Sequence, residues 1–308
     1  MRNVYLGTSD FAATVLKHLS ESAHKPVLVV TRPARPKGRG RTLQDPPVAD
    51  LANELGLDVF QPESVNDPEA VERISAASGE ALSVCAFGAI VKEPFLSMMP
   101  SFNVHPSLLP RWRGAAPVER AIAAGDEATG VTIMRLVEAL DAGPMAAQDR
   151  IQIGPADNYG TLAPQLAELG GRLLVEALDA AAAGTDTWTD QADAEAERPV
   201  TYAEKITRED RVLTPSSATA VELELMIRAL TPHIGAMFET ASGDPLRVEE
   251  ARVVEESIPA GTAVAVEGRL LVGTPTGSLE LLRVKPAGKQ AMDVSSYLRG
   301  NDVPELTG

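Results

Sequence analysis

An amide and an imidazole lie two residues apart in the sequence Asn103-Val104-His105, directly before Pro106. If this segment is extended, its side chains alternate, and Asn103 and His105 face the same side. Together they can donate hydrogen bonds to an oxygen that acquires negative charge, as in acyl transfer. A polar loop that caps neighbouring backbone would contain the same residues, so the pair alone leaves both interpretations open.

Asp141 is the carboxylate that would complete such a site. It lies in a turn-like sequence, 139–144, between two apolar stretches. A lone aspartate in a tight turn usually bonds to its own backbone. Next to His105, however, it would orient the imidazole and raise its basicity, as general acid–base chemistry requires. Asn103, His105 and Asp141 are therefore the candidate catalytic residues.

One of the two tryptophans, Trp112, stands between Arg111 and Arg113. An aromatic ring flanked by cations can stack on a flat ligand or on a nucleic-acid base. A packed ring with two solvated arginines is the competing interpretation.

Residues 31–41 carry five positive charges and no negative one, in a chain of net charge −15. An acidic chain repels nucleic acid on average, so any RNA contact needs a local basic patch. Most charge runs are solvated surface loops, but against this acidic background we favour contact with phosphates. Glycines in the run predict a flexible loop that orders on binding.

Short apolar strands that alternate with helices must position these residues. This pattern predicts a parallel sheet with helices on both faces. The turn 7–9 after the first strand lacks the three-glycine dinucleotide fingerprint, so we expect it to connect strand and helix at the border of the active-site cleft rather than to bind a dinucleotide. The predicted strands lie at 4–6, 27–30, 58–60, 82–86 and 131–136.

The second half changes character. A helix is predicted over 158–183, ended by Gly184. A polar, acidic, aperiodic stretch follows, and beyond it short alternating segments separated by Gly and Pro predict a small antiparallel barrel. We therefore expect a catalytic domain at 1–186, a linker at 187–205 and a smaller domain at 206–308.

Composition limits the remaining possibilities. The single cysteine, Cys85, forms no intrachain disulfide and no cysteine cluster for zinc. No apolar run approaches the roughly 20 residues of a membrane span, and the chain opens on a strand-like run rather than a signal peptide. We expect a soluble, cytoplasmic monomer with no membrane contact.

The chain resembles the methionyl-tRNA formyltransferase family along nearly its whole length. The trio Asn103, His105 and Asp141 alone would resemble any folate-dependent formyltransferase, whereas the basic run and the second domain narrow the resemblance to the tRNA enzymes. The segments that carry it, in order, are 35–40, 60–62, 103–117, 130–134, 140–143, 201–205 and 285–289.

The resemblance implies a Rossmann-like α/β domain joined to an OB-like β-barrel. It implies 10-formyltetrahydrofolate as the formyl-donating cosubstrate, initiator methionyl-tRNA as the acceptor, and no metal. The catalytic trio carries over to Asn103, His105 and Asp141. Folate contacts carry over to Phe87, Gly88, Ser107, Leu108, Leu109, Pro110 and Asp141. Contacts with tRNA carry over to Arg32, Arg35, Lys37, Arg39 (the key position), Arg41, Arg111, Arg113 and Lys205.

The chain also departs from the family. An Asn-Pro-Trp-Pro segment of the family appears here as Thr231-Pro232-His233-Ile234, which lacks its aromatic contact. Residues 206–308 have ten Lys and Arg against fifteen Asp and Glu, a net charge of −5. A basic groove in this part would need strong segregation of charge by face.

Three alternatives remain at this point. The trio does not distinguish a formyltransferase acting on a sugar nucleotide or a purine precursor, although neither needs the arginine-rich run. An RNA-binding protein without catalysis would not need the trio. A nucleotide-dependent dehydrogenase would need the missing glycine pattern.

Overall fold

The computed structural model describes residues 1–37, 42–195 and 198–307, which form two compact units. The first unit comprises Met1–Gly114, Thr129–Ile151 and Ala163–Tyr202. The second comprises Ala115–Ala128, Gln152–Leu162 and Ala203–Gly308. Each unit thus takes residues from separate parts of the sequence. The boundaries at 186 and 206 stay a prediction.

A seven-stranded sheet forms the centre of the first unit, in the order β10-β9-β7-β6-β1-β2-β5. The strands from β5 to β7 are parallel, and β9 runs antiparallel to β7. Strands β1, β6 and β7 are buried along their whole length, as expected for strands covered on both faces. The bounds are β1 Asn3–Gly7, β2 Pro26–Val30, β5 Val59–Phe60, β6 Ala81–Cys85, β7 Ser101–His105, β9 Ala128–Met134 and β10 Met145–Gln152.

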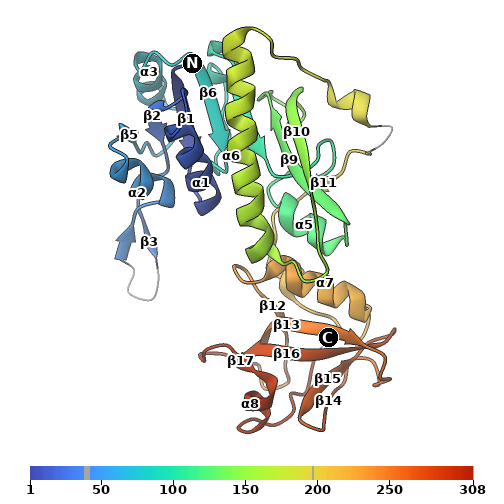
Figure 1. Ribbon diagram of the computed structural model, residues 1–308. Coiled ribbons are helices and arrows are strands. Elements are labelled where there is room, and N and C mark those ends of the chain that lie inside the picture. Colours follow the sequence, from blue (N-terminus) through green and yellow to red (C-terminus); the bar gives the residue numbers. More distant parts are fainter. Residues whose placement is uncertain (38–41, 196–197, 308) are drawn as a thin grey trace. The chain divides into compact units, whose positions relative to one another are not determined.

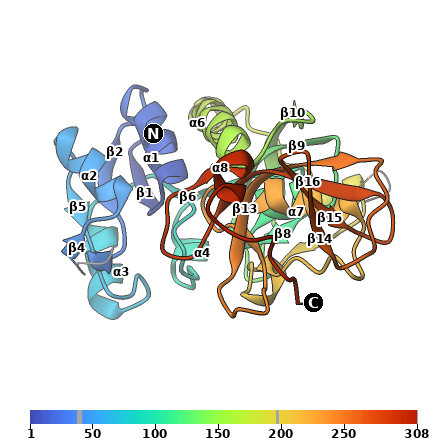
Figure 2. The same ribbon diagram turned by 90° about the horizontal axis from the view of Figure 1, so that it is seen from below.

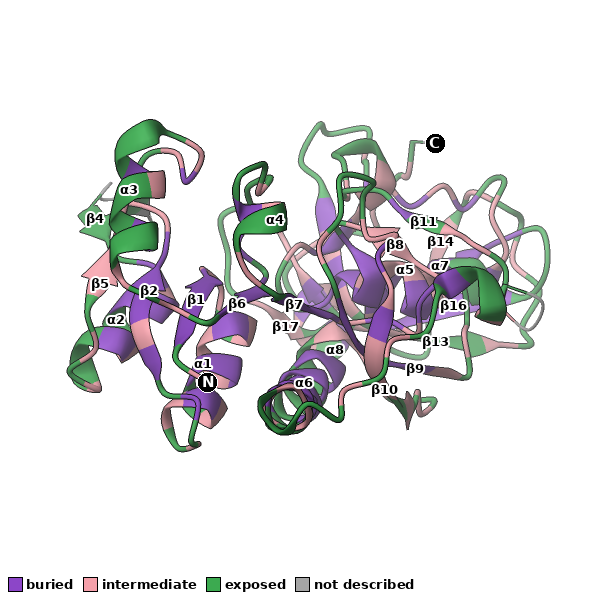
Figure 3. Cartoon of the chain, turned by 90° about the horizontal axis from the view of Figure 1, so that it is seen from above, coloured by how far each residue is buried: buried purple, intermediate pink, exposed green. Residues whose placement is uncertain are grey.

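Helices cover both faces of this sheet (Figure 3). Helices α1 (Asp10–Ser20), α2 (Pro47–Glu54) and α6 (Tyr159–Ala183) lie on one face, and α3 (Pro68–Ala76) and α4 (Phe95–Met98) lie on the other. The predicted α/β fold with a mostly parallel sheet is confirmed. Helix α6 ends before Gly184, whose φ is +67°, as its sequence predicts.

Close packing fixes the helices next to the sheet. A Cβ on Gly171 would lie 2.4 Å from the ring of His18, so glycine lets α6 approach α1. Under α1, the Tyr5 hydroxyl donates to the Ala12 carbonyl oxygen at 2.6 Å. Cys85 is buried, and its burial raises the pKa of the thiol to about 12. The prediction that Cys85 is a core residue is confirmed.

The second unit contains an antiparallel sheet in the order β12-β13-β16-β15-β14, with β17 paired to β16 (Figures 1 and 2). Helix α7 begins with a capping box between Thr219 and Glu222 and packs against α5 and β13. The small antiparallel domain is thus confirmed. The bounds are α5 Pro117–Ala123, α7 Ala220–Leu230, β12 Ala236–Phe238, β13 Leu246–Val254, β14 Ala263–Val266, β15 Arg269–Gly273, β16 Ser278–Lys285, β17 Met292–Asp293 and α8 Val294–Leu298.

Candidate active site

Strand β7 places Asn103 and His105 on one side of the sheet. Asn103 pairs with Met134 of β9 and with Val84 of β6, so β7 has neighbours on both edges. Asn103 is 9% exposed and His105 is 4% exposed. The extended segment that the sequence predicts is confirmed as a buried strand, which leaves both side chains little freedom to move.

The imidazole of His105 is held by a backbone carbonyl. Its Nε2 lies 2.8 Å from the carbonyl oxygen of Trp112. Because a carbonyl oxygen can only accept, Nε2 carries a hydrogen and donates it. Trp112 has a φ of +66°, a left-handed conformation that is uncommon for a bulky residue. The carbonyl that holds the His105 ring therefore belongs to a residue in this uncommon conformation.

The other ring nitrogen faces Asp141. The distance from His105 Nδ1 to Asp141 Oδ2 is 3.7 Å, which is an ion-pair distance rather than a hydrogen bond. The same Oδ2 accepts the N–H of Gly114 at 2.9 Å. The carboxylate of Asp141 is thus turned toward the His105 segment. The structure brings together His105 and Asp141, which are 36 residues apart in the sequence.

Asp141 itself occupies a left-handed backbone conformation, with a φ of +48°. Aspartate tolerates this region better than most residues, but the conformation still costs free energy and needs support. That support comes from Gln191, whose Nε2 donates to the carbonyl oxygens of Asp141 and Gly143, each at 2.8 Å. Gln191 lies in η1 (Gln191–Ala194), inside the stretch predicted as a linker. Sequence reasoning missed it because nothing local marks its partner.

The turn 107–110 after β7 is fixed by the hydroxyl of Thr132. This hydroxyl donates to the Ser107 carbonyl at 2.7 Å and accepts the N–H of Leu109 at 3.2 Å. Gln148 Nε2 donates to Thr132 Oγ1 and to the Leu109 carbonyl, at 2.7 and 3.1 Å. Ser107, Leu109 and Pro110 are buried. Thr132 and Gln148 were also missed in the sequence.

Leu108 is the half-buried residue of this turn. A Cβ on Gly130 would lie 2.5 Å from its side chain and 2.1 Å from the carbonyl oxygen of Asp149. Gly130 therefore lets Leu108 pack onto β9 while β10 passes alongside. The folate contacts expected at Ser107, Leu108, Leu109 and Pro110 stay a prediction.

Phe87 and Gly88 follow β6. Phe87 packs in the core with Val84 and Phe95, and its carbonyl accepts the hydroxyl of Thr8 at 2.9 Å. Gly88 is exposed and has a φ of +75°. Any ligand contact in this segment would therefore fall to the exposed Gly88 rather than to the Phe87 side chain.

One short strand lies in the basic run and a second follows it. Strand β3 (Arg35–Lys37) pairs antiparallel with β4 (Thr42–Gln44), so Arg35 and Lys37 lie in a strand rather than in the expected loop. The glycines from which the flexibility is expected, Gly38 and Gly40, lie outside the described residues. Arg35 is exposed. Arg39 and Arg41 lie outside the described residues.

The other predicted tRNA contacts fall in different surroundings. Arg32 lies beside Gly88, where an added Cβ would be 3.5 Å from Arg32 Nη1. The guanidinium of Arg111 lies over the Trp112 ring, 4.2 Å from its centre. Arg113 Nε donates to Gln191 Oε1 at 2.9 Å, and Lys205 is exposed. A contact with RNA stays a prediction for each of these residues.

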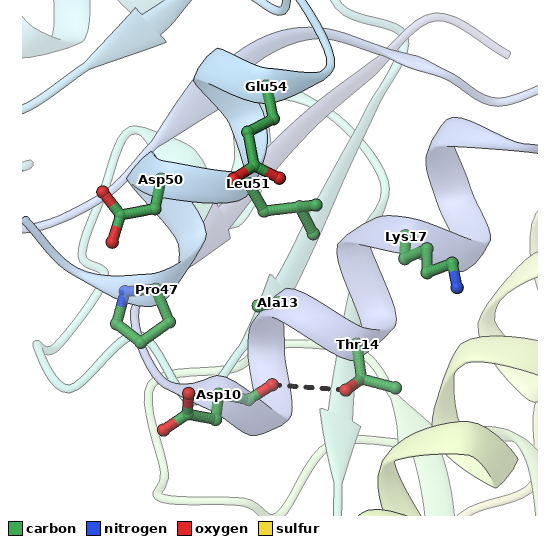
Figure 4. A pocket seen from close by; sticks show the side chains of 8 residues that line it. All are labelled: Asp10, Ala13, Thr14, Lys17, Pro47, Asp50, Leu51 and Glu54. Atoms are coloured by element: carbon green, nitrogen blue, oxygen red, sulfur yellow. Dashed lines mark hydrogen bonds between the residues drawn. The ribbon is translucent and has the colours of Figure 1, made fainter.

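A groove of about 480 Å³ lies between α1 and α2 (Figure 4). Asp10, Asp50 and Glu54 line it together with Lys17. The carbonyl of Asp10 accepts the Thr14 hydroxyl within α1, at 3.3 Å. Among the predicted site residues that the structure describes, none lines this groove, so it is separate from the trio.

Within the described ranges, no three His, Cys, Asp or Glu side chains are grouped as a metal site would require. In the same residues, no helix is long and apolar enough to cross a bilayer.

The Formyl transferase family model matches residues 1–178, and the Formyl transferase, C-terminal domain model matches residues 205–302. A methionyl-tRNA formyltransferase of Phenylobacterium zucineum is 41% identical, over 99% of this chain and 98% of the relative. One of Halorhodospira halophila is 43% identical, over 97% and 96%.

Solved structures share the fold at low identity. A sugar 3N-formyl transferase, WlaRD, has a TM-score of 0.66 at 15% identity and covers 94% of this chain and 99% of its own. HypX from Aquifex aeolicus in complex with tetrahydrofolic acid has a TM-score of 0.64 at 17% identity. The match covers 97% of this chain and 47% of the HypX chain. These similarities concern the fold alone. Identity over nearly the full length, together with both family models, shows that the chain belongs to the methionyl-tRNA formyltransferase family.

Proposed function

We propose that this chain transfers the formyl group of 10-formyltetrahydrofolate to the α-amine of methionyl initiator tRNA, for translation initiation. The observation that carries the proposal is the placement of His105 Nδ1 3.7 Å from Asp141 Oδ2, beside Asn103. The chain that contains this arrangement is 41–43% identical to methionyl-tRNA formyltransferases. Fold similarity to a sugar formyltransferase at 15% identity gives no comparable support for a sugar acceptor.

The donors present fit a formyl group. The bound folate supplies a formyl carbon on nitrogen, and attack on that carbon places negative charge on the formyl oxygen. The Asn103 amide and the His105 ring are both nearly buried, so their hydrogen bonds to such an oxygen act with little competition from water. Loss of one such donor typically lowers the rate by roughly 10²–10³-fold.

The position of Asp141 suits the attacking amine. Its carboxylate lies 3.7 Å from His105 Nδ1, next to the site where the formyl oxygen would be held. The amine would lose its proton to Asp141 as the new C–N bond forms. The proton then passes to the departing nitrogen, directly or through water, so the charges balance. Holding both substrates in attack geometry supplies much of the remaining acceleration.

The choice of acceptor rests on a different set of residues. Arg35 is exposed on β3 within the basic run, where it can contact tRNA phosphates. Arg111 and the Trp112 ring already form a stacked pair next to the carbonyl that holds His105. We propose that these cations, with Arg32, Lys37, Arg39, Arg41, Arg113 and Lys205, bind the acceptor.

We also propose that the enzyme works as a cytoplasmic monomer. Light scattering during gel filtration should then give a mass near 32.5 kDa. A mass of twice that value would contradict this.

The test of function offers the purified protein 10-formyltetrahydrofolate with three acceptors: methionyl initiator tRNA, an amino sugar nucleotide and a purine-precursor amine. Formyl-methionine should form, and the other two amines should stay unmodified. His105→Ala should abolish turnover while folate binding, measured by calorimetry, stays close to that of the unaltered enzyme. Normal turnover by this variant would refute the role of His105, and formylation of only a small amine would refute the tRNA assignment.

A further inference from the structure

Gln191 is a buried amide that touches both segments holding the catalytic carboxylate. Gln191 is only 3% exposed. Nε2 donates to the carbonyl oxygens of Asp141 and Gly143, and Oε1 accepts the N–H of Arg113 Nε at 2.9 Å. Both N–H groups of the amide and its oxygen are therefore hydrogen-bonded within the protein.

The chemistry of its partners fixes the orientation of the amide. The two carbonyl oxygens can only accept, so they must face the NH₂ group, and the guanidinium N–H of Arg113 can only donate, so it must face the oxygen. A reversed amide would place like against like at all three contacts. Gln191 therefore specifies one arrangement of the 141–143 turn relative to Arg113.

This arrangement matters because the same two segments hold the carboxylate. Gly114, next to Arg113, donates its N–H to Asp141 Oδ2 at 2.9 Å. At the other end, a Cβ on Gly143 would lie 1.9 Å from the Arg135 carbonyl oxygen, so the turn is packed closely against its neighbour. Between these two points, Asp141 is held at a φ of +48°. Without the two donated hydrogen bonds, this strained turn could relax and move the carboxylate.

We propose that Gln191 is a positioning residue of the formyl-transfer site, whose amide directs the Asp141 carboxylate toward His105 by tying the 141–143 turn to the 113–114 segment. The inference rests on the proposed role of Asp141 in formyl transfer. It assigns a function in the reaction to a segment whose sequence predicts only a linker.

The first variant is Gln191→Glu, which has the same shape. Its carboxylate keeps an acceptor for Arg113 but sets oxygen against the carbonyl oxygens of Asp141 and Gly143. Because a misplacement of about 1 Å can cost about 10²-fold, we expect kcat to fall roughly 10- to 100-fold at saturating tRNA and folate, with the folate KM unchanged. Gln191→Ala, which removes the donors without adding repulsion, should show a smaller loss in the same direction.

The matched control is Ala192→Glu. It adds the same negative charge to the next residue of η1, which is exposed. It should leave kcat unchanged. A loss of similar size in this control would show that charge, rather than the lost donors, slows the reaction, and would overturn the proposal.

A double-mutant cycle separates positioning from general structural damage. In an Asp141→Ala background, Gln191→Glu should cause no further loss of kcat, since the group it positions is gone. An equal fractional loss in both backgrounds, or a wild-type kcat for Gln191→Glu alone, would overturn the proposal. If Asp141→Ala alone kept full activity, the proposed role of Asp141 would fail first and this inference with it. Loss in Asp141→Ala without loss in Gln191→Glu would refute only the inference.

Discussion

The proposed catalytic trio and the β3–β4 pair belong to the same unit but are held in opposite ways. His105 lies on a strand paired on both edges, and a carbonyl holds its ring. By contrast, β4 is exposed at every residue, and Leu43 within it is 67% exposed. Acyl transfer depends on atoms fixed within a fraction of an ångström, whereas attraction to phosphates extends over several ångströms and tolerates motion. We infer that the reaction and the choice of acceptor are separable.

A large loss of activity is expected when the Asn103 hydrogen-bond donor is removed from the buried strand β7. Asn103→Ala should lower kcat roughly 10²–10³-fold while folate and tRNA binding persist. Steady-state kinetics of formyl-methionyl-tRNA formation would measure this. Asn53→Ala, on an exposed position of α2, is the control and should have no effect. A raised KM with an unchanged kcat would instead make Asn103 a simple binding residue.

Arg35→Ala tests the role of the exposed β3–β4 pair. We expect the tRNA KM to rise roughly 10-fold, with kcat at saturation unchanged, and the dependence of log affinity on log salt to lose about one unit of slope. The matched control is Arg73→Ala, which removes an exposed arginine paired with Asp58 in the same unit. If Arg73→Ala weakened tRNA binding equally, the effect would reflect net charge rather than the β3 position.

Thr132→Val removes the hydroxyl that supports the turn after β7. The Leu109 N–H and the Ser107 carbonyl would each lose a buried partner. Leaving such groups unpaired should reduce the free energy of unfolding by about 1–3 kcal/mol and raise the folate KM. Urea unfolding and kinetics together would measure this. An unchanged stability would mean that the turn does not depend on Thr132.

The smallest expected effect is the labelling of Cys85, which pairs with Val104 between Asn103 and His105. Burial raises the pKa of its thiol to about 12, so almost no thiolate exists at pH 8. Iodoacetamide should label the native protein only as fast as the sheet opens, and should label the urea-unfolded protein readily. Rapid native labelling would show that the strands under the trio are mobile.

The sequence predicted those parts of the site that local pattern determines. Alternation in 103–105 placed Asn103 and His105 on one side, and the run of cations marked the β3 region. It did not reveal Gln191, Thr132 or Gln148, because each acts on a residue distant in the chain. The contacts that these side chains make form only when β9 and β10 pack beside β7.

Strands β10 and β3, which the sequence did not predict, have a similar explanation. Strand β10 has exposed and half-buried residues without clear alternation, and β3 is only three residues long and contains Pro36. Both are stabilised by pairing with a neighbour rather than by their own propensity. The stretch 187–205 was polar enough to indicate a linker, yet it contains the buried Gln191, which contacts the Asp141 turn.

The most direct test of whether the reaction and the choice of acceptor are separable is single-turnover formylation by Asp141→Ala and Arg35→Ala. Both variants are measured at saturating folate and saturating methionyl initiator tRNA. We predict that Arg35→Ala reacts at the wild-type rate once tRNA is saturating, whereas Asp141→Ala is slower by at least roughly 10²-fold. A wild-type rate for Asp141→Ala, or a slow step in Arg35→Ala that added tRNA does not restore, would contradict it.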